Sequence, residues 1–428
     1  MPAFHRSVCL PVGAYKAKPE RLRCRGGRIS VESPPSSRNN MDRPSVLMQR
    51  DDSIYLDYNA TTPVLPEVVE AMLPYLREHW GNPSSGHAFG RRAHLAIDVA
   101  RQQVADLIGC AADEIVFTSG GTEANNLALR GVTEAVVERR QVVTSTVEHP
   151  SIAAPCAWLE RHGWSICRLE VGHDGRVVLE QLSANIGAAT ALVTIMHSNN
   201  ETGVLQPIAT ITRAARAAGA LTHTDAAQSL GKIPVDVNAL DVDLLSIAGH
   251  KLYAPKGIGA LYVRRGTPLK PFTLGAGHEQ GLRPGTENVA AIAGLGAACE
   301  LARRSVNAAG ARMSELRNRL WGLLSARVSG LILNGDVKER LPNTLNVCFP
   351  RVSGTALLAA TPEVAASTGA ACHDGREMPS EVLLAMGVSA EQAISSVRLT
   401  LGRLTTDAEI ERAADALATA WIALTNRQ

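Results

Sequence analysis

Hydrophobic and polar positions follow two periods that alternate along most of the chain. Residues 91–108 and 206–219 place apolar side chains at helical spacing. Between such stretches lie short apolar or β-branched runs: QVVTSTVEH (141–149), ATALVTIMHSNN (189–200), ALTHTDAA (220–227), DLLSIAGHK (243–251) and GALYVRR (259–265). Helices alternating with buried strands predict an α/β fold with a mostly parallel sheet covered on both faces. Ligands bind such sheets at the carboxyl ends of the strands.

The pattern changes after about residue 300. We expect a long helix from Ala291 to about Val328, short strands at 331–333 and 344–349, the strand-like SVRLTLGR (396–403) and a last helix beginning near Thr406. This predicts a smaller α+β domain at the C-terminus. The expected divisions are an N-terminal extension (1–50), a segment that joins the small domain (51–65), a large domain (66–308) and the small domain (309–428).

Composition indicates a large globular protein, with 428 residues, 45% of them apolar, and a net charge of +2. No apolar run approaches the roughly 20 residues needed to span a bilayer, so we expect no membrane association. Residues 1–40 hold eight Lys or Arg against two acids. The rest of the chain is mildly acidic, which argues against binding to nucleic acid.

The first 50 residues lack hydrophobic periodicity and are rich in Arg, Pro and Ser, which predicts disorder. Two interpretations stay open. This basic segment is an organelle-targeting sequence, or translation begins at Met41 or Met48.

Eight cysteines are dispersed along the chain, and no two of them show CxxC spacing. This excludes the usual zinc and dithiol motifs, and we expect no metal. A reducing compartment is indicated, and the cytoplasm is the expected location. Cys372 differs from the others because it lies in a loop of small residues, ASTGAACHDGREMPS. A thiol in such a polar loop can ionise and reach a substrate.

Lys251 and Asp225 each follow an apolar run directly. A lysine at a strand end, wrapped by Gly, Pro and small residues, points into a crevice, where desolvation lowers its pKa and makes it a nucleophile. An aspartate at the end of an earlier strand suits a pyridinium nitrogen. Together they suggest pyridoxal 5'-phosphate (PLP) held as a Schiff base. The alternative is an ordinary turn lysine and a loop aspartate.

Other polar residues also follow strands. SGGTEANN (119–126) offers free backbone N–H groups at a helix start, which predicts an anion site at Gly121 and Thr122 or else a tight turn with Thr122 as N-cap. His149 in TVEHP is suited to stacking on a cofactor ring or moving a proton, although a lone histidine is more often structural. SNNETG (198–203) supplies amides, or caps a turn.

Two arginine-containing segments are candidates for anion binding. The loop GHEQGLRPGTENVA (277–290), with Thr286, is suited to closing over a phosphate, or is a plain surface loop. Arg398 in SVRLTLGR is either packing near the core or the fork that binds a carboxylate.

Eleven motifs in order carry a family resemblance: YLDYNATTP, GNPSSGHAFGR, FTSGGTEANN, VEHPSI, NNETG, HTDAAQSLGK, GHKLYAPKGIGALYVR, RPGTENV, LPNTLNV, STGAACH and VRLTLGR. The chain resembles the class V aminotransferase superfamily, specifically the NifS/IscS-like cysteine desulfurases. The resemblance runs from about Tyr55 to the last helix. It implies PLP fold type I, with a seven-stranded sheet in the large domain, and a homodimer with active sites at the subunit interface.

The resemblance also implies a role for each matching residue. The catalytic residues would be Lys251, which forms the Schiff base and moves the α-proton, Cys372, which takes sulfur as a persulfide, and His149, which stacks on the ring. The cofactor would be bound by Asp225 at the pyridine nitrogen, by Gln228 and Asn200 at the ring oxygen, by Gly121, Thr122 and His250 at the phosphate, and by Thr286 at the phosphate of the partner subunit. The substrate carboxylate would pair with Arg398, helped by Asn59.

The implied reaction converts L-cysteine to L-alanine, with sulfur passing from Cys372 to an acceptor protein in iron–sulfur cluster assembly or thiolation. Two residues depart from the family pattern. Ala248 stands where a phosphate-site serine is often found, and His373 after the nucleophile resembles the selenocysteine lyases. Against the lyase, Pro150 stands where the animal lyases carry an acid. A selenocysteine lyase stays an alternative, as does a non-catalytic sulfur-handling partner, which the intact site residues disfavour.

Overall fold

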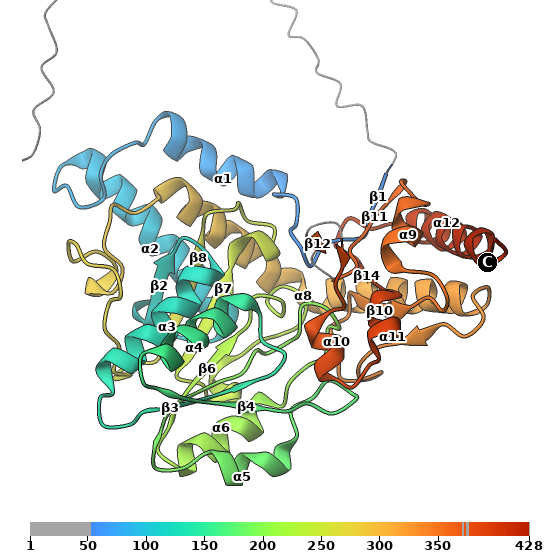
Figure 1. Cartoon of the computed structure of the whole chain (residues 1–428). Coiled ribbons are helices and arrows are strands. Elements are labelled where there is room, and N and C mark those ends of the chain that lie inside the picture. Colours follow the sequence, from blue (N-terminus) through green and yellow to red (C-terminus); the bar gives the residue numbers. More distant parts are fainter. Residues whose placement is uncertain (1–52, 370–371, 374–375, 428) are drawn as a thin grey trace, which may run out of the picture. The chain divides into compact units, whose positions relative to one another are not determined.

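The computed structural model describes residues 53–369, 372–373 and 376–427, and at 372–373 and 376–377 the backbone alone. The expected N-terminal extension (1–50) lies outside the described residues. Within them, no helix is both long and apolar enough to cross a membrane. Figure 1 shows the arrangement of the elements.

A seven-stranded, mostly parallel sheet forms the centre of the fold, as the family resemblance implies. In spatial order its strands are β2 (Ile115–Thr118), β8 (Gly259–Val263), β7 (Leu244–Ala248), β6 (Leu221–Asp225), β5 (Thr190–Thr194), β3 (Gln141–Ser145) and β4 (Ser165–Leu169). Only β8 runs against the others in this sheet, because both of its neighbours pair with it antiparallel. The carboxyl ends of the six remaining strands therefore share one edge.

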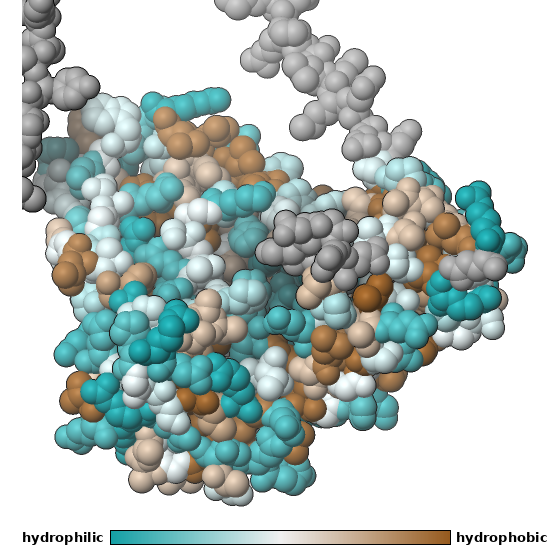
Figure 2. Space-filling model, viewed as in Figure 1, coloured by the Kyte–Doolittle hydropathy of each residue, from teal (hydrophilic) through white to brown (hydrophobic). Residues whose placement is uncertain are grey.

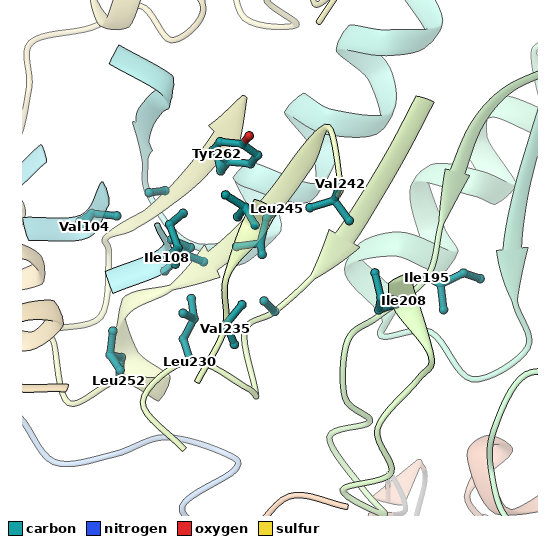
Figure 3. Packing of buried hydrophobic residues seen from close by; sticks show 14 of the residues in the cluster. Val104, Ile108, Ile195, Ile208, Leu230, Val235, Val242, Leu245, Leu252 and Tyr262 are labelled. Carbon is teal, nitrogen blue, oxygen red and sulfur yellow. The ribbon is translucent and has the colours of Figure 1, made fainter. Parts of the chain in front are cut away.

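Both faces of this sheet are apolar, and successive residues of a strand point to opposite faces. Leu245 packs into one cluster with α2 (Ala88–Ile108), α6 (Ile208–Ala217) and α8 (Val289–Ser325). Its neighbour Leu244 packs into a second cluster with α3 (Gly121–Ala135) and α4 (Pro150–Arg161). Figure 3 shows part of the first cluster, to which Val104 and Ile108 of α2 and Leu245 and Tyr262 of the sheet all belong. Because helices cover both faces of the sheet, a functional site is expected at its carboxyl edge.

The C-terminal part is built on a three-stranded antiparallel sheet in the order β14 (Ser396–Thr400), β10 (Thr344–Cys348) and β9 (Ile332–Leu333). Its core includes the end of α8, α9 (Gly354–Ala359) and α12 (Asp407–Thr425). The first strand, β1 (Ile54–Tyr55), pairs with β11 (Val364–Ala365), so the start of the described chain packs with the C-terminal part. The helix α8 runs through the expected boundary at 308/309, and the division into domains stays a prediction.

Other elements are short or lie at the periphery. They are α1 (Pro66–Arg77), α5 (Leu182–Asn185), α7 (Val237–Leu240), β12 (Cys372–His373), β13 (Arg376–Glu377), α10 (Glu381–Ala385) and α11 (Ala390–Ile394).

Candidate active site

A cavity of about 430 Å³ lies at the carboxyl edge of the sheet. Polar side chains that follow five different strands meet in it, as the topology requires. Ten residues expected from the sequence line it, which are Asn59, Gly121, Thr122, His149, Asn200, Asp225, Gln228, His250, Lys251 and, from β14, Arg398.

Lys251 ends the short turn Gly249–Lys251 that follows β7. A Cβ at Gly249 would meet the carbonyl oxygen of Ile258 at 2.8 Å, so this tight turn requires glycine. The Lys251 ammonium donates to the carbonyl oxygens of Asn59 and of Ala60, the latter at 2.7 Å. Burial, and then the positive charge of Arg398, lower the pKa of Lys251 to about 8. Far more of this amine is therefore unprotonated near neutral pH than in an ordinary lysine, and the unprotonated form is the nucleophile.

Asp225 is the last residue of β6 and is buried. Its Oδ2 accepts a hydrogen bond from Asn125 Nδ2 at 2.7 Å, and its Oδ1 accepts one from the backbone N–H of Ala227 at 2.9 Å. These two donors fix the plane of the carboxylate at the cavity wall. Such a carboxylate can bind a protonated ring nitrogen.

His149 is the N-cap of α4, and its Nδ1 accepts from the backbone N–H of Ser151 at 3.1 Å. The Ser151 hydroxyl lies 2.8 Å from the same nitrogen and also accepts from Asn125 Nδ2 at 2.7 Å. Burial lowers the pKa of His149, while the charge of Asp225 raises it and that of Lys251 lowers it. A neutral imidazole whose Nδ1 is occupied presents a fixed ring face beside the cavity.

The start of α3 forms the anion end of the cavity. Gly120 has φ +153° and ψ 179°, a conformation that only glycine adopts readily, and it turns the chain from β2 into the helix. Gly121 and Thr122 then present backbone N–H groups, which have no partner within the helix. His250 lies beside them, with Nδ1 3.2 Å from the Thr61 hydroxyl. Burial and three lysine charges lower the pKa of His250 to about 4, so it is neutral here.

Ala248 fits this packing. A Cβ added at Gly121 would lie 3.1 Å from the Ala248 Cβ, so these two residues are in close contact. The missing serine hydroxyl leaves the backbone and Thr122 as the donors at this end.

Arg398 lies in β14 and is 7% exposed. Its Nη2 donates to Asp57 Oδ1 at 2.7 Å and its Nη1 to the carbonyl of Asn200 at 3.1 Å. Its buried Nε has no partner among the described residues. The guanidinium is thus held in place with donor capacity left, which suits it to a carboxylate.

The side chain of Asn59 is committed to the protein. Its Nδ2 donates to Asn200 O at 3.2 Å and to Thr344 Oγ1 at 3.0 Å, and its Oδ1 accepts from Asn343 Nδ2 at 3.1 Å. Its carbonyl oxygen faces Lys251 and also accepts from Gln228 Nε2 at 3.0 Å. A contact between Asn59 and the substrate stays a prediction.

Two expected site residues are not assigned to the cavity, one because it lies elsewhere and one because its side chain lies outside the described residues. Thr286 is exposed and does not line it. Cys372 lies in β12, whose backbone pairs with β13, and its side chain lies outside the described residues. Their roles stay predictions.

The structure adds residues that the sequence reasoning missed. Asn125 and Ser151 orient Asp225 and His149, and Asp57 orients Arg398. A sequence signal existed for Asn125, because it follows Gly121 by four residues on one helix and so lies on the same face. Asp57 gave no such signal, since its partner is 341 residues away.

Comparison with known proteins identifies the family. Residues 54–413 match the aminotransferase class-V family. The chain is 46% identical over 361 residues to a cysteine desulfurase of Trichormus azollae, covering 84% of this chain and 90% of the relative. It is 48% identical over 364 residues to the cysteine desulfurase IscS of Anaeromyxobacter dehalogenans, with the same coverage.

Solved structures give the same result. A NifS-like protein superposes with a TM-score of 0.81 at 35% identity, covering 87% of this chain and 99% of its own. SspA, solved in complex with cysteine, superposes with a TM-score of 0.73 at 36% identity, covering 83% and 100%. The chain therefore belongs to the class-V aminotransferase family, among its NifS/IscS-like members.

Proposed function

We propose that this protein is a PLP-dependent cysteine desulfurase, which converts L-cysteine to L-alanine and carries the sulfur as a persulfide on Cys372. One observation carries the proposal. A desolvated lysine, a fixed carboxylate, a capped histidine and a held arginine surround a single cavity. The relatives named cysteine desulfurase cover most of the chain and support the same reaction.

The described residues fit PLP. Lys251 would supply the amine for its aldehyde, Asp225 the anion for its ring nitrogen, and the start of α3 the donors for its phosphate. His149 would supply a flat face for the ring and Gln228 a donor for the ring oxygen. When bound, PLP would supply an electron sink for the pair left when the substrate Cα loses its proton.

The chain's own residues perform the rest of the reaction. Arg398 binds the substrate carboxylate, and Lys251 accepts the proton from Cα. The Cys372 thiolate attacks the substrate sulfur, so that a sulfur–sulfur bond forms as the bond between sulfur and Cβ breaks. The electron pair left on the substrate takes up a proton, which gives alanine. An acceptor protein then removes the sulfur from Cys372.

Release of alanine from L-cysteine tests the proposal. We expect the parent protein, loaded with PLP, to release alanine, and Cys372→Ser to lose this activity. Cys110→Ser is a matched control, because Cys110 is a free thiol that follows the C-terminal end of α2 and does not line the cavity. Alanine release by Cys372→Ser at the parent rate would refute the persulfide mechanism. Release from selenocysteine alone would favour the lyase, to which His373 points.

We further propose a homodimer. Large apolar side chains are exposed on and near α1 and α2, with Leu76 62% exposed, Trp80 72% and Leu95 62%. Figure 2 shows hydrophobic residues gathered over α1. Such a patch is typical of an interface. A hollow of about 1330 Å³ lined by α2 and residues 276–280 adjoins the segment that carries Thr286.

The homodimer has a direct test. We expect light scattering to give the mass of two chains, and we expect Leu95→Glu to shift the protein towards the mass of one chain.

The cytoplasm is the proposed location, because the five described cysteines outside the Cys372 segment are free thiols.

A further inference from the structure

Lys232 is a buried lysine in the turn after β6, and the proposed reaction does not use it. It is 5% exposed, and no carboxylate among the described residues forms an ion pair with it. Burial lowers its pKa, and the charges that face it, Lys251 and Arg398, are both positive. A buried amine in these surroundings is costly, so its two contacts need an explanation.

Both contacts of the Lys232 amine are with one residue of the cavity wall. Its Nζ donates to the carbonyl oxygen of Gln228 at 2.9 Å and to the side-chain Oε1 of Gln228 at 2.8 Å. Gln228 is itself 6% exposed and lines the cavity. Lys232 therefore reaches the site through Gln228.

These contacts decide which way the Gln228 amide points. With Oε1 bound to Lys232, Nε2 faces the opposite side, where it donates to the Asn59 carbonyl at 3.0 Å. The same carbonyl accepts from Lys251. A flipped amide would set its NH2 group against the Lys232 amine and its oxygen against the Asn59 carbonyl. The contact between the two oxygens would be repulsive and the hydrogen bond from Lys232 to Oε1 would be lost, so one orientation is selected.

The turn that carries Lys232 is itself held in place. The backbone N–H of Lys232 donates to the Ser229 carbonyl at 3.1 Å. Gly231 before it has φ +73°, and a Cβ there would meet Leu252 Cδ1 at 2.2 Å. A left-handed glycine in contact with Leu252 thus aims Lys232 inward. Gly310 of α8 covers the turn, since a Cβ there would lie 2.9 Å from the Lys232 carbonyl.

We propose that Lys232 is a positioning residue, which locks the Gln228 amide so that its N–H donors face the Asn59 carbonyl and the cofactor ring oxygen. This inference rests on the proposed PLP function. A donor at the ring oxygen stabilises bound PLP, and an oxygen in its place would repel it. Lys232 thus contributes to cofactor affinity without contacting the cofactor.

A double-mutant cycle on PLP binding tests this role. The dissociation constant is measured by titrating the PLP-free full-length protein with PLP and following the absorbance of the bound cofactor. We expect Lys232→Met and Gln228→Leu each to weaken binding about tenfold, as for one lost hydrogen bond, and to shift the absorbance band. The double variant is expected to bind no more weakly than Gln228→Leu. Lys338→Met, at an exposed lysine, is the matched control and should bind as the parent does.

Each other outcome overturns the inference. If Lys232→Met weakens PLP binding equally in the Gln228→Leu background, Lys232 does not act through Gln228. Parent-like binding by Lys232→Met also refutes it. A parent protein that does not bind PLP would instead refute the proposed function.

A second variant serves if Lys232→Met does not fold. Gln228→Glu keeps an acceptor for Lys232 but turns an oxygen towards the cavity. We expect it to bind PLP at least tenfold more weakly while its unfolding midpoint stays at or above that of the parent. Parent-like PLP affinity in this variant would show that the orientation of the donor is irrelevant.

Discussion

Arg398 donates from Nη2 to Asp57 Oδ1 at 2.7 Å, which ties β14 to the chain segment just after β1. The contact uses part of the guanidinium fork and leaves Nε, which is buried and has no partner among the described residues. The pair therefore orients Arg398 before any substrate carboxylate arrives. Preorganisation of this kind lowers the entropy that binding must overcome.

Replacement of Arg398 tests its assignment to the substrate carboxylate. Lysine keeps the charge but cannot contact Asp57, Asn200 and a carboxylate in one plane. We expect Arg398→Lys to raise KM for cysteine at least tenfold, with a smaller fall in kcat, in assays of alanine release. Arg312→Lys, which alters an exposed arginine that pairs with Glu315, should leave both constants unchanged. An unchanged KM in Arg398→Lys would contradict the assignment.

Asp57 also acts on Lys251. Burial and Arg398 lower the pKa of Lys251 to about 8, whereas the negative charge of Asp57 raises it. Removing that charge in Asp57→Asn disfavours the ammonium, so the pKa of Lys251 falls further. The free amine is the form that reacts with PLP. In the PLP-free protein we expect the rate of PLP incorporation to rise with pH about a midpoint near 8, and the midpoint to move to lower pH in Asp57→Asn.

The control for this shift is Asp415→Asn, since Asp415 is exposed and pairs with Arg327 away from the cavity. Its midpoint should equal that of the parent. A midpoint that stays constant or rises in Asp57→Asn would show that Asp57 does not stabilise the Lys251 ammonium.

The sequence predicted the parts of the site that topology brings together. Thr122, His149, Asn200, Asp225 and Lys251 each follow an apolar run, and parallel strands end at one edge. Hydrophobic periodicity identified the strands, so it also identified their ends. The same periodicity predicted both ends of the long helix α8 to within a few residues.

Contacts between distant segments were not predictable in this way. Asp57 lies beside Arg398 only because β1 and β14 both pack into the C-terminal core. In sequence, Lys232 resembles a solvent-exposed turn lysine. In the fold, the turn at Gly231 and the covering helix α8 direct it towards Gln228. Periodicity reports which face of an element is apolar, not which polar groups meet across the fold.

The surroundings of Glu148 predict that the free energy of unfolding depends on pH. Glu148 is partly buried, its Oε1 accepts from the Ser145 hydroxyl at 2.6 Å and from Met196 N at 3.0 Å, and desolvation raises its pKa from 4.5 to about 8. Between these two values the native state holds a proton that the unfolded state releases. Stability from this group is therefore present below pH 4.5 and is lost as the pH rises through about 8.

The neutral isostere removes this titration. Glu148→Gln keeps an oxygen for both donors, so we expect its thermal midpoint to gain on that of the parent steadily between pH 5 and pH 8. Glu339→Gln, at an exposed position, should track the parent across the same range. A constant difference between Glu148→Gln and the parent would mean that Glu148 is ionised throughout.

Gly369 lies just before the segment that carries Cys372, and its contact with Glu201 gives a further prediction. It has φ +69°, and a Cβ there would meet Glu201 Oε2 at 2.7 Å. The same carboxyl oxygen accepts from the Ser380 hydroxyl at 2.5 Å, so Glu201 contacts the chain on both sides of Cys372. We expect Gly369→Ala to cost about 1–2 kcal/mol through backbone strain and to reduce sulfur transfer while PLP binding is retained.

Proteolysis of the 370–377 segment and alanine release would measure these effects. Gly266→Ala is the control, because Gly266 also has a positive φ of +84° but nothing lies within 4 Å of its added Cβ. It should lose similar backbone stability yet keep sulfur transfer. Equal losses of sulfur transfer in both variants would show that the contact with Glu201 is irrelevant.

The buried pair of Arg101 and Glu279 holds the segment that leads to Thr286. Arg101 donates to both carboxyl oxygens of Glu279, at 2.8 and 2.7 Å, and the backbone N–H of Phe117 donates to the same carboxylate at 2.7 Å. Glu279 has φ +46°, a strained value that these three donors enforce. Removal of one charge from a buried pair leaves the other uncompensated, which typically costs about 3–5 kcal/mol.

We therefore expect Glu279→Gln to lower the urea midpoint of unfolding and, if Thr286 reaches the phosphate of the partner subunit, to weaken PLP binding by the dimer as well. The neighbouring pair of Arg265 and Asp113 is the matched control, because it is also a two-bond arginine–carboxylate contact, but an exposed one. Solvent screens such a pair, so Asp113→Asn should leave both the urea midpoint and the PLP affinity unchanged. Equal destabilisation by the two variants would show that burial does not set the strength of the Glu279 contact. A loss of stability in Glu279→Gln with parent-like PLP affinity would instead separate the fold of this segment from the cofactor site and count against the assignment of Thr286.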